Sequence, residues 1–321
     1  MSPRILVYGW YGQGNLGDDL FIECFKQLFP TYNFIFTDHI TASHLKNVDA
    51  VFFGGGSFLT DSPKISAEAL DILKKLRIFY IGVGTETKIN PVHQELMKLA
   101  KLIATRSSVN IDSVKEINPN TILIQDLVYC LPEQSCSNKI KDSILVIPNI
   151  LVVPKWSDPH WKHVSWDFFK TEFCQLLDEY CKQGYNIKFL PMCINDHWND
   201  QNAAVEIINR MTEGKGSFIL NKSVDIQSAI ETISKYELVI SQRFHGTVLA
   251  RLARTPCLTI HHHDKLKNIG DYSLSYYGLS KSNVIEQINK SKSFNISDIL
   301  PIDRDIYNGL VQTVASLMAQ V

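Results

Sequence analysis

Short apolar runs alternate with amphipathic segments along most of this chain, and this alternation restricts the fold more than any other feature. The first runs expected to form strands are Ile5–Trp10, Asn33–Thr37, Ala50–Phe53, Arg77–Ile81, Leu102–Thr105 and Thr121–Ile124. The helices expected between them include Asp19–Phe29, Ile65–Lys75 and Val109–Ile117. Strands that alternate with helices predict an α/β fold with a mainly parallel, doubly wound sheet.

The pattern starts again after a polar stretch at Pro132–Lys141. The later strands are expected at Ser143–Ile147, Asn186–Leu190, Ser217–Leu220, Glu237–Ile240 and Pro256–Ile260, with helices at Trp166–Lys182, Asp196–Met211 and Asp225–Lys235. A chain of 321 residues is long enough for two domains of roughly 100–200 residues each. We therefore expect one α/β domain at 1–135, a second at 142–302, and a C-terminal helix at 303–321.

Charge and apolar content argue against several classes of protein. The net charge is −1, so no general basic field favours nucleic acid. No apolar run reaches the roughly 18 residues that a membrane span needs, and Ile5–Trp10 is too short for the core of a signal peptide. The seven cysteines show no CxxC pairing. We expect reduced thiols in a cytoplasmic protein that does not span a membrane.

The stretch Ile240–Ala250 combines a cation with a proton donor. The apolar run Glu237–Ile240 ends in a loop that carries Arg243 and His245, and Gly246 begins a helix-like run. This predicts a turn at the carboxyl end of a strand, where α/β folds bind ligands. A fixed cation and a histidine at a helix N-terminus suit an anionic substrate that is protonated during its reaction.

Three glycine-bearing turns follow strands in the first half, at Gly9–Asp19, Gly54–Gly56 and Gly82–Gly84. Glycine lets the backbone bend tightly and approach a ligand, although Gly54–Gly56 also fits a close strand-to-helix crossing. The first turn has no Gly-Lys-Ser/Thr, so it is not a P-loop, and Asp18 and Asp19 would repel a phosphate. Either aspartate caps the helix, orients or deprotonates a sugar hydroxyl, or does both.

Other polar residues near strand ends are ambiguous by themselves. Arg106 and Asp126 each fit a surface ion pair as well as a ligand site. The run His261–Asp264 suggests a metal, but alternate strand residues face opposite sides, so at most His261 and His263 share an ion. No third ligand has convincing spacing, and we expect no metal site. Lys265 fits an anion site or a solvated surface equally well.

Taken together, these motifs resemble the polysaccharide pyruvyl transferase family. The segments that carry the resemblance are Gly12–Asp19, Gly54–Phe58, Gly82–Gly84, Arg106, Asp126, Arg243–Gly246 and Asp264–Lys265. The resemblance implies two Rossmann-like domains with mainly parallel sheets facing across a cleft, as in GT-B glycosyltransferases. It also implies transfer of the pyruvyl group of phosphoenolpyruvate to a sugar diol of a glycan. The family shows Arg-Asp-Ser near Arg106, whereas this chain has Ser107 and Ser108 after the arginine.

The chemistry that the resemblance implies assigns roles to the motif residues. Phosphoenolpyruvate is the donor substrate and no cofactor is expected. The catalytic residues would be His245, the acid that protonates the methylene carbon, with Arg243 and Asp18. The donor-binding residues would be Arg243, Arg106, Lys265, Gly246 and His263. The acceptor-binding residues would be Gly14, Asn15, Asp18, Asp19, Gly55 and Gly56, with the Trp156–Trp166 segment stacking on sugar rings.

Two other functions fit the same motifs. One is a glycosyltransferase of the same architecture that uses a nucleotide-sugar, which would need a carboxylate for the ribose; Asp225 and Glu231 lack convincing spacing. The other is a carbohydrate-binding protein without activity, for which the missing aspartate after Arg106 is the only support. A nucleotide-sugar that stabilises the fold more than phosphoenolpyruvate would favour the first alternative.

Overall fold

The computed structural model describes residues 2–85, 88–149, 166–195, 199–213, 218–219, 226–261, 272–275 and 302–320, with positions 266, 269, 282, 285–286 and 289–290. The chain divides into two compact units. The first contains Met1–Gly14, Asp18–Leu131 and Ile302–Val321, and the second contains Asn15–Gly17 and Pro132–Pro301. The C-terminal helix, expected as a separate segment, is therefore grouped with the first unit.

The first unit is built on a parallel sheet with the strand order β2-β1-β3-β4-β5-β6. These strands are β1 (Arg4–Tyr8), β2 (Asn33–Thr37), β3 (Ala50–Gly56), β4 (Arg77–Val83), β5 (Leu102–Thr105) and β6 (Thr121–Leu123). Its helices are α1 (Leu16–Leu28), α2 (Ala67–Leu73), α3 (Pro91–Leu99), α4 (Ile111–Ile117), the 3-10 turn η1 (Leu127–Cys130) and α11 (Asp305–Ala319). β1 pairs with both β2 and β3, so the chain reverses its direction of winding between β1 and β3.

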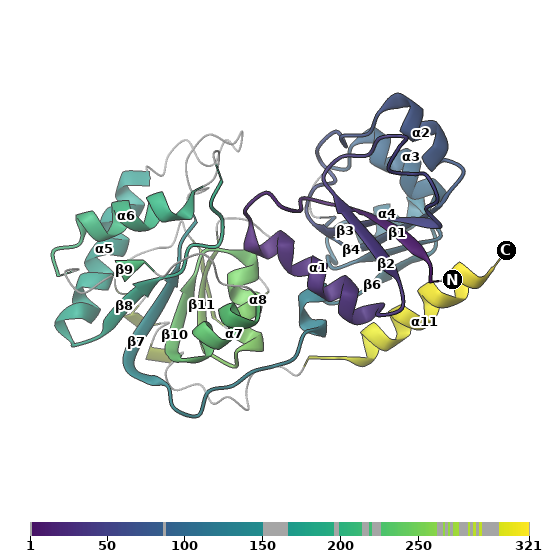
Figure 1. Cartoon of the computed structure of the whole chain (residues 1–321). Helices are drawn as coiled ribbons and strands as arrows, with labels where there is room; N and C mark the ends of the chain where they lie inside the picture. The colour runs from purple at the N-terminus through teal and green to yellow at the C-terminus, as the bar shows by residue number, and fades with distance from the viewer. Residues whose placement is uncertain are drawn as a thin grey trace. The chain divides into compact units, whose positions relative to one another are not determined.

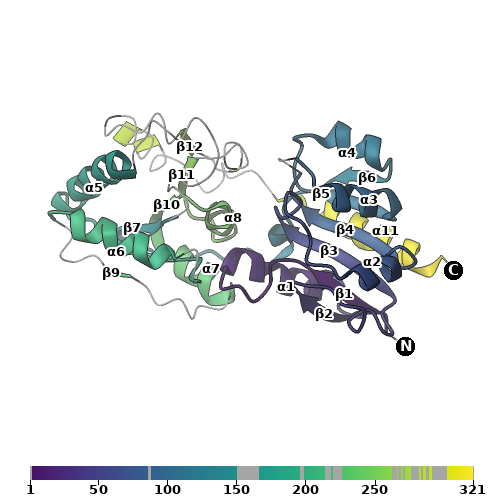
Figure 2. The same cartoon turned by 90° about the horizontal axis from the view of Figure 1, so that it is seen from above.

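Helices cover both faces of this sheet (Figures 1 and 2). α2, α3 and α4 pack on one face, through a core that includes Leu73, Leu96 and Val114. α1 and α11 lie on the opposite face. There Phe25 of α1 lies 6.0 Å from Phe52 of β3, measured between ring centroids. An apolar stripe on every helix and strands buried on both faces are what a doubly wound sheet requires.

The second unit repeats this plan with the strand order β12-β11-β10-β7-β8-β9, again all parallel. Its strands are β7 (Ile140–Ile147), β8 (Asn186–Phe189), β9 (Phe218–Ile219), β10 (Tyr236–Ser241), β11 (Cys257–His261) and β12 (Tyr272–Ser275). Its described helices are α5 (Trp166–Lys182), α6 (Asp200–Arg210), α7 (Ile226–Ser234) and α8 (Phe244–Leu252). α5 and α6 lie on one face of the sheet, and α7 and α8 on the other (Figures 1 and 2). The expected α/β class with two Rossmann-like units and parallel sheets is confirmed.

Within the described ranges, no helix combines the length and the apolar character needed to cross a bilayer. All seven cysteines are free thiols.

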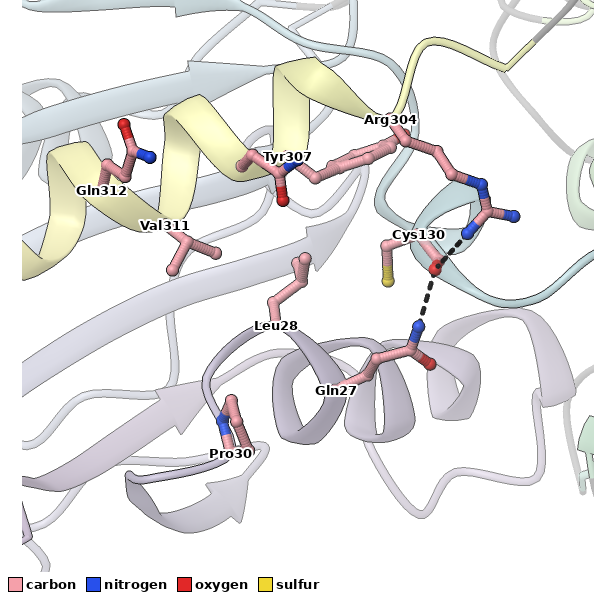
Figure 3. Close-up of a pocket in the computed structure, with 9 residues that line it drawn as sticks. Gln27, Leu28, Pro30, Cys130, Arg304, Tyr307, Val311 and Gln312 are labelled. Carbon is pink, nitrogen blue, oxygen red and sulfur yellow. Dashed lines mark hydrogen bonds between the residues drawn. The ribbon is translucent and has the colours of Figure 1, made fainter.

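α11 packs beside α1 and leaves a pocket of about 610 Å³ between them (Figure 3). Gln27 Nε2 and Arg304 both donate to the carbonyl oxygen of Cys130, at 2.8 and 3.4 Å. Tyr307 of α11 donates to the carbonyl oxygen of Asp126 at 2.6 Å, and burial raises the pKa of its hydroxyl. The pocket lies at the C-terminal end of α1, away from the glycine-bearing turns that follow the strands. It contains no residue that the sequence motifs point to.

A buried histidine makes the first unit sensitive to acid. His93 is fully buried, with Nδ1 3.1 Å from the Tyr80 hydroxyl, and burial lowers its pKa to about 4. The unfolded state binds this proton at higher pH than the folded state does. The free energy of unfolding should therefore fall as pH drops from about 6.5 to about 4, by roughly 3 kcal/mol in total.

His93→Gln should remove this part of the pH dependence while keeping a partner for Tyr80. Urea unfolding of wild type and variant at several pH values measures the effect. His39→Ala, at an exposed histidine, is the matched control and should keep the full decline. A decline of equal size in wild type and His93→Gln would refute the assignment.

Candidate functional site

The winding of the second unit reverses between β7 and β10, and both strands end at the same edge of the sheet. β10 pairs directly with β7. Gln242 joins the two ends, because its backbone N–H donates to the Ile147 carbonyl at 2.9 Å and its Oε1 accepts from Asn149 N at 3.0 Å. Ligands in open α/β sheets bind at such a reversal, outside the carboxyl ends of the strands.

Arg243 and His245 lie at this reversal. Arg243 is the N-cap of α8, with φ −105° and ψ 137°, and His245 is in the first helical turn. Backbone N–H groups in that turn favour an anion. Gly246 is required by packing, since a Cβ there would lie 2.4 Å from Ser241 Oγ. The donor contact expected of Gly246 stays a prediction, with its backbone N–H as the relevant group.

Asp200, which the sequence motifs did not identify, holds Arg243. Nε of Arg243 donates to Asp200 Oδ2 at 3.0 Å, and Nη2 donates to Oδ1. The Asp200 side chain is fully buried and the Arg243 side chain is 12% exposed. A bidentate pair of this kind fixes both the position and the plane of the guanidinium. The clue in the sequence was weak, because an aspartate in the first turn of a helix is common.

Gly17 lies against the ring of His245, although the two are far apart in sequence. The segment Asn15–Gly17 belongs to the second unit, where Leu16 N donates to the Met192 carbonyl at 2.8 Å. A Cβ added to Gly17 would lie 2.3 Å from His245 Nδ1. Only glycine fits this approach without a shift of one of the two groups. Within the second unit, the structure thus brings the Asn15–Gly17 segment beside His245.

The aspartates of the first glycine turn lie inside a helix rather than in front of it. α1 begins at Leu16, so the expected start at Asp19 is wrong, and Asn15 Oδ1 accepts from Gly17 N at 3.2 Å. Asp19 Oδ1 instead accepts from Gly12 N at 2.8 Å and closes the loop. Asp18 points toward β3, where a Cβ added to Gly56 would lie 3.0 Å from its Oδ1.

Close packing accounts for two glycines of the second turn. A Cβ at Gly55 would lie 2.3 Å from Phe21 Cδ2, and a Cβ at Gly54 would lie 2.3 Å from Phe25 Cζ. Both phenylalanines belong to α1, so the close strand-to-helix crossing is present. The acceptor contacts predicted for Gly55, Gly56, Gly14 and Asn15 stay predictions.

Arg106 forms a buried ion pair. Its Nη1 lies 2.5 Å from Asp126 Oδ2, and its Nη2 donates to Ser57 Oγ at 3.1 Å. Both side chains of the pair are only 3% exposed, so the expectation of a surface ion pair is wrong. Three strand ends, after β3, β5 and β6, are therefore joined by one guanidinium. The donor contact expected of Arg106 stays a prediction, and this degree of burial does not favour it.

Asp126→Asn should destabilise the first unit by about 3–5 kcal/mol, because it leaves the buried Arg106 without its counter-charge. Denaturant unfolding measures the loss. Glu23→Gln is the control, since Glu23 is exposed where it pairs with Lys26, and it should change stability by less than about 0.5 kcal/mol. Equal stability of the two variants would show that the Arg106 pair contributes little.

Several expected site residues lie outside the described residues: His263, Lys265 and nearly all of the Trp156–Trp166 segment. His261 ends β11 and is partly exposed. In the part of the chain that the structure describes, no three His, Cys, Asp or Glu side chains are grouped so as to hold a metal ion.

Comparisons with known proteins agree with this architecture. The structure is similar to that of UDP-GlcNAc 2-epimerase from Methanocaldococcus jannaschii, with a TM-score of 0.64 and 9% sequence identity. The alignment covers 98% of this chain and 100% of the epimerase chain. UDP-GlcNAc 2-epimerase from Neisseria meningitidis bound to UDP-GlcNAc aligns over 98% of this chain and 100% of its own, with a TM-score of 0.58 and 10% sequence identity. The UDP-N-acetylglucosamine 2-epimerase from Rickettsia bellii aligns over 99% of this chain and 97% of its own, with a TM-score of 0.60 and 11% sequence identity. At these identities the likeness shows a shared GT-B-like fold. No curated protein matches the chain.

A family model gives the more specific result. The model described as polysaccharide pyruvyl transferase matches residues 15–264. That range begins at the segment that contacts His245 and includes Asp200, Arg243 and Gly246. The match covers well over half of the chain, and the resemblance seen in the motifs is confirmed. The chain belongs to the polysaccharide pyruvyl transferase family.

Proposed function

We propose that this protein transfers the pyruvyl group of phosphoenolpyruvate to two hydroxyls of a sugar, forming a pyruvate ketal on a glycan or glycan precursor. The observation that carries the proposal is the pairing of a fixed guanidinium with a histidine at one helix N-terminus, beside the reversal of the second sheet. A donor that carries both a phosphate and a carboxylate and that needs protonation matches this pairing. The family match supports a transferase that acts on polysaccharide.

The proposed reaction conserves the protons of the donor and the diol. His245 gives a proton to the methylene carbon of phosphoenolpyruvate, and the adjacent carbon gains oxocarbenium character. One sugar hydroxyl attacks that carbon and loses its proton. The carbon–oxygen bond to phosphate then breaks, and the second hydroxyl closes the ketal. Of the two protons lost by the diol, one replaces the proton used on the methylene carbon and one leaves with phosphate.

Arg243 would bind the phosphate or the carboxylate of the donor. Guanidinium suits either group because it stays charged and presents several donors in one plane. The α8 N-terminus would add backbone N–H groups to the same anion. Asp18 is proposed to orient or deprotonate an acceptor hydroxyl, and we expect the reaction to use no metal or cofactor.

A labelled reaction tests the proposal. The protein is incubated with phosphoenolpyruvate in D₂O together with a panel of free and nucleotide-linked hexoses. We expect phosphate release that depends on one acceptor, and a ketal methyl group that contains one solvent deuterium. Phosphate release without a sugar product would indicate simple hydrolysis and overturn the proposal.

Thermal unfolding adds a binding test. A ligand at a hundredfold excess over its Kd stabilises the native state by about 2.7 kcal/mol. We expect this stabilisation with phosphoenolpyruvate, whether or not a nucleotide-sugar that serves as acceptor also stabilises the protein. A shift with a nucleotide-sugar alone would favour glycosyl transfer on the same fold.

Gly17→Ala should strongly reduce turnover, because the added methyl group would lie 2.3 Å from His245 Nδ1 and displace the ring. The expected loss approaches that of a missing general acid, at least about tenfold. Steady-state kinetics measure it. Gly309→Ala, in α11 with nothing within 4 Å of the added Cβ, is the control and should keep full activity. Normal turnover in Gly17→Ala would show that the ring position is unimportant.

A further inference from the structure

One buried carboxylate in the second unit accepts hydrogen bonds from two different parts of the site. Asp200, the first residue of α6, accepts from Arg243 Nε and Nη2. Its Oδ2 also accepts from the backbone N–H groups of Met192, at 3.2 Å, and Cys193, at 2.9 Å. Three of these four donors therefore converge on Oδ2, and one reaches Oδ1. A carboxylate, with about four lone-pair sites in all, can accept this many hydrogen bonds only when it is ionised.

The burial of Asp200 makes this arrangement rigid. Asp200 is fully buried. An ionised carboxylate is stable in such a place only if its hydrogen bonds are made. The N-terminus of α6 also favours a negative charge at this position. A second link ties the same segment to α6, since Asp200 N donates to the Cys193 carbonyl at 2.8 Å. Neither partner of Asp200 can turn away without leaving a buried charge partly unpaired.

The Met192–Cys193 segment extends this connection to His245. Asn15 forms an isolated antiparallel bridge with Cys193, and Leu16 N donates to the Met192 carbonyl. The next residue, Gly17, lies against the His245 ring. Asp200 therefore contacts Arg243 directly and supports, through one backbone segment, the residue that lies against His245.

We propose that Asp200 is a positioning residue, which fixes the Arg243 guanidinium and the Asn15–Gly17 segment relative to His245. The proposal rests on the proposed function for its kinetic consequence, but its structural part stands on the contacts alone. The opposite role, in which Asp200 competes with an anionic donor for Arg243, predicts the reverse sign: removal of its charge would then tighten donor binding.

The kinetic test compares Asp200→Asn with Asp178→Asn. Asp178 is a matched control in the same unit, because it is also buried and accepts from the backbone N–H groups of Thr212 and Glu213, at 3.0 and 2.8 Å. We expect Asp200→Asn to lower kcat/KM for phosphoenolpyruvate at least about tenfold, and Asp178→Asn to leave it within about twofold.

A double-variant cycle separates positioning from general damage. In the Arg243→Ala background, Asp200→Asn should change kcat/KM much less than in wild type, because part of its effect is carried by Arg243. Arg243→Lys, which keeps the charge but not the fork, should lose about as much as Asp200→Asn. The proposal would be overturned if Asp200→Asn lowered kcat/KM by the same factor in wild type and in Arg243→Ala. Tighter binding of phosphoenolpyruvate by Asp200→Asn would also overturn it.

Hydrogen exchange gives a readout that does not require activity. In Asp200→Asn, the Nε–H of Arg243 and the amide of Leu16 should exchange faster than in wild type, while Asp178→Asn should leave both unchanged. Unchanged exchange in Asp200→Asn would overturn the proposal whatever the kinetics show. If wild type does not use phosphoenolpyruvate, the proposed function fails while this exchange test still decides the role of Asp200.

Discussion

His245→Ala is expected to lower kcat with phosphoenolpyruvate by about 10²–10⁴-fold, the usual contribution of a general acid. The donor affinity should change far less, because the phosphate and carboxylate are proposed to be held by Arg243 and the α8 N-terminus. Steady-state kinetics with the acceptor at saturation separate the two parameters. Deuterium incorporation into the product methyl group should slow in parallel with kcat.

His39→Ala is the matched control for this variant. His39 is exposed in the first unit, where it pairs with Asp38, and its removal should leave kcat unchanged. Near-normal turnover in His245→Ala would exclude His245 as the acid. A loss confined to donor affinity would instead make it a binding residue.

Arg243→Ala is expected to lower both the stability and the donor affinity. It leaves the fully buried Asp200 without its counter-charge, and breaking a buried pair in this way costs about 3–5 kcal/mol. It also removes the proposed clamp, so the thermal shift produced by phosphoenolpyruvate should disappear. Denaturant unfolding with and without the ligand measures both effects in one series.

Two comparisons give this prediction its controls. Arg254→Ala breaks a more exposed pair with Glu133, and exposed pairs contribute about 0–1 kcal/mol. The double variant Asp200→Ala/Arg243→Ala should be more stable than Arg243→Ala alone, because no buried charge is then left unpaired. A retained thermal shift in Arg243→Ala would reject Arg243 as the donor clamp.

The strand and helix elements could largely be predicted from periodicity. The bounds of β2, β5 and α5 agree with the expected ranges at both ends. Other elements differ by a few residues, as at the start of α1. The prediction missed β12, where Tyr272–Ser275 lacks a long apolar run, and the short η1 turn. Short elements depend on neighbours for their hydrogen bonds, so local sequence specifies them weakly.

The site could be predicted only in part. Arg243 and His245 were identified because their strand-to-helix turn is local, and local turns follow from local sequence. The contact of Asp200 with Arg243 could not be predicted in this way. The two residues belong to separate β–α units, and whether these units are adjacent depends on the strand order. Arg106 was found by its position, but its burial with Asp126 and Ser57 was not expected.

The family, the α/β class and the motif residues that follow the strands can be predicted from the amino-acid sequence alone, because periodicity and short motifs depend only on residues that are close together in the chain. Which strand ends are adjacent is seen only in the folded protein, and so are the contact of Gly17 with His245 and the ion pair of Asp200 with Arg243. The physical reason is that strand order is set by the packing of whole units. Close packing of the backbone then fixes the place of a side chain such as His245, and a buried counter-charge fixes one such as Arg243.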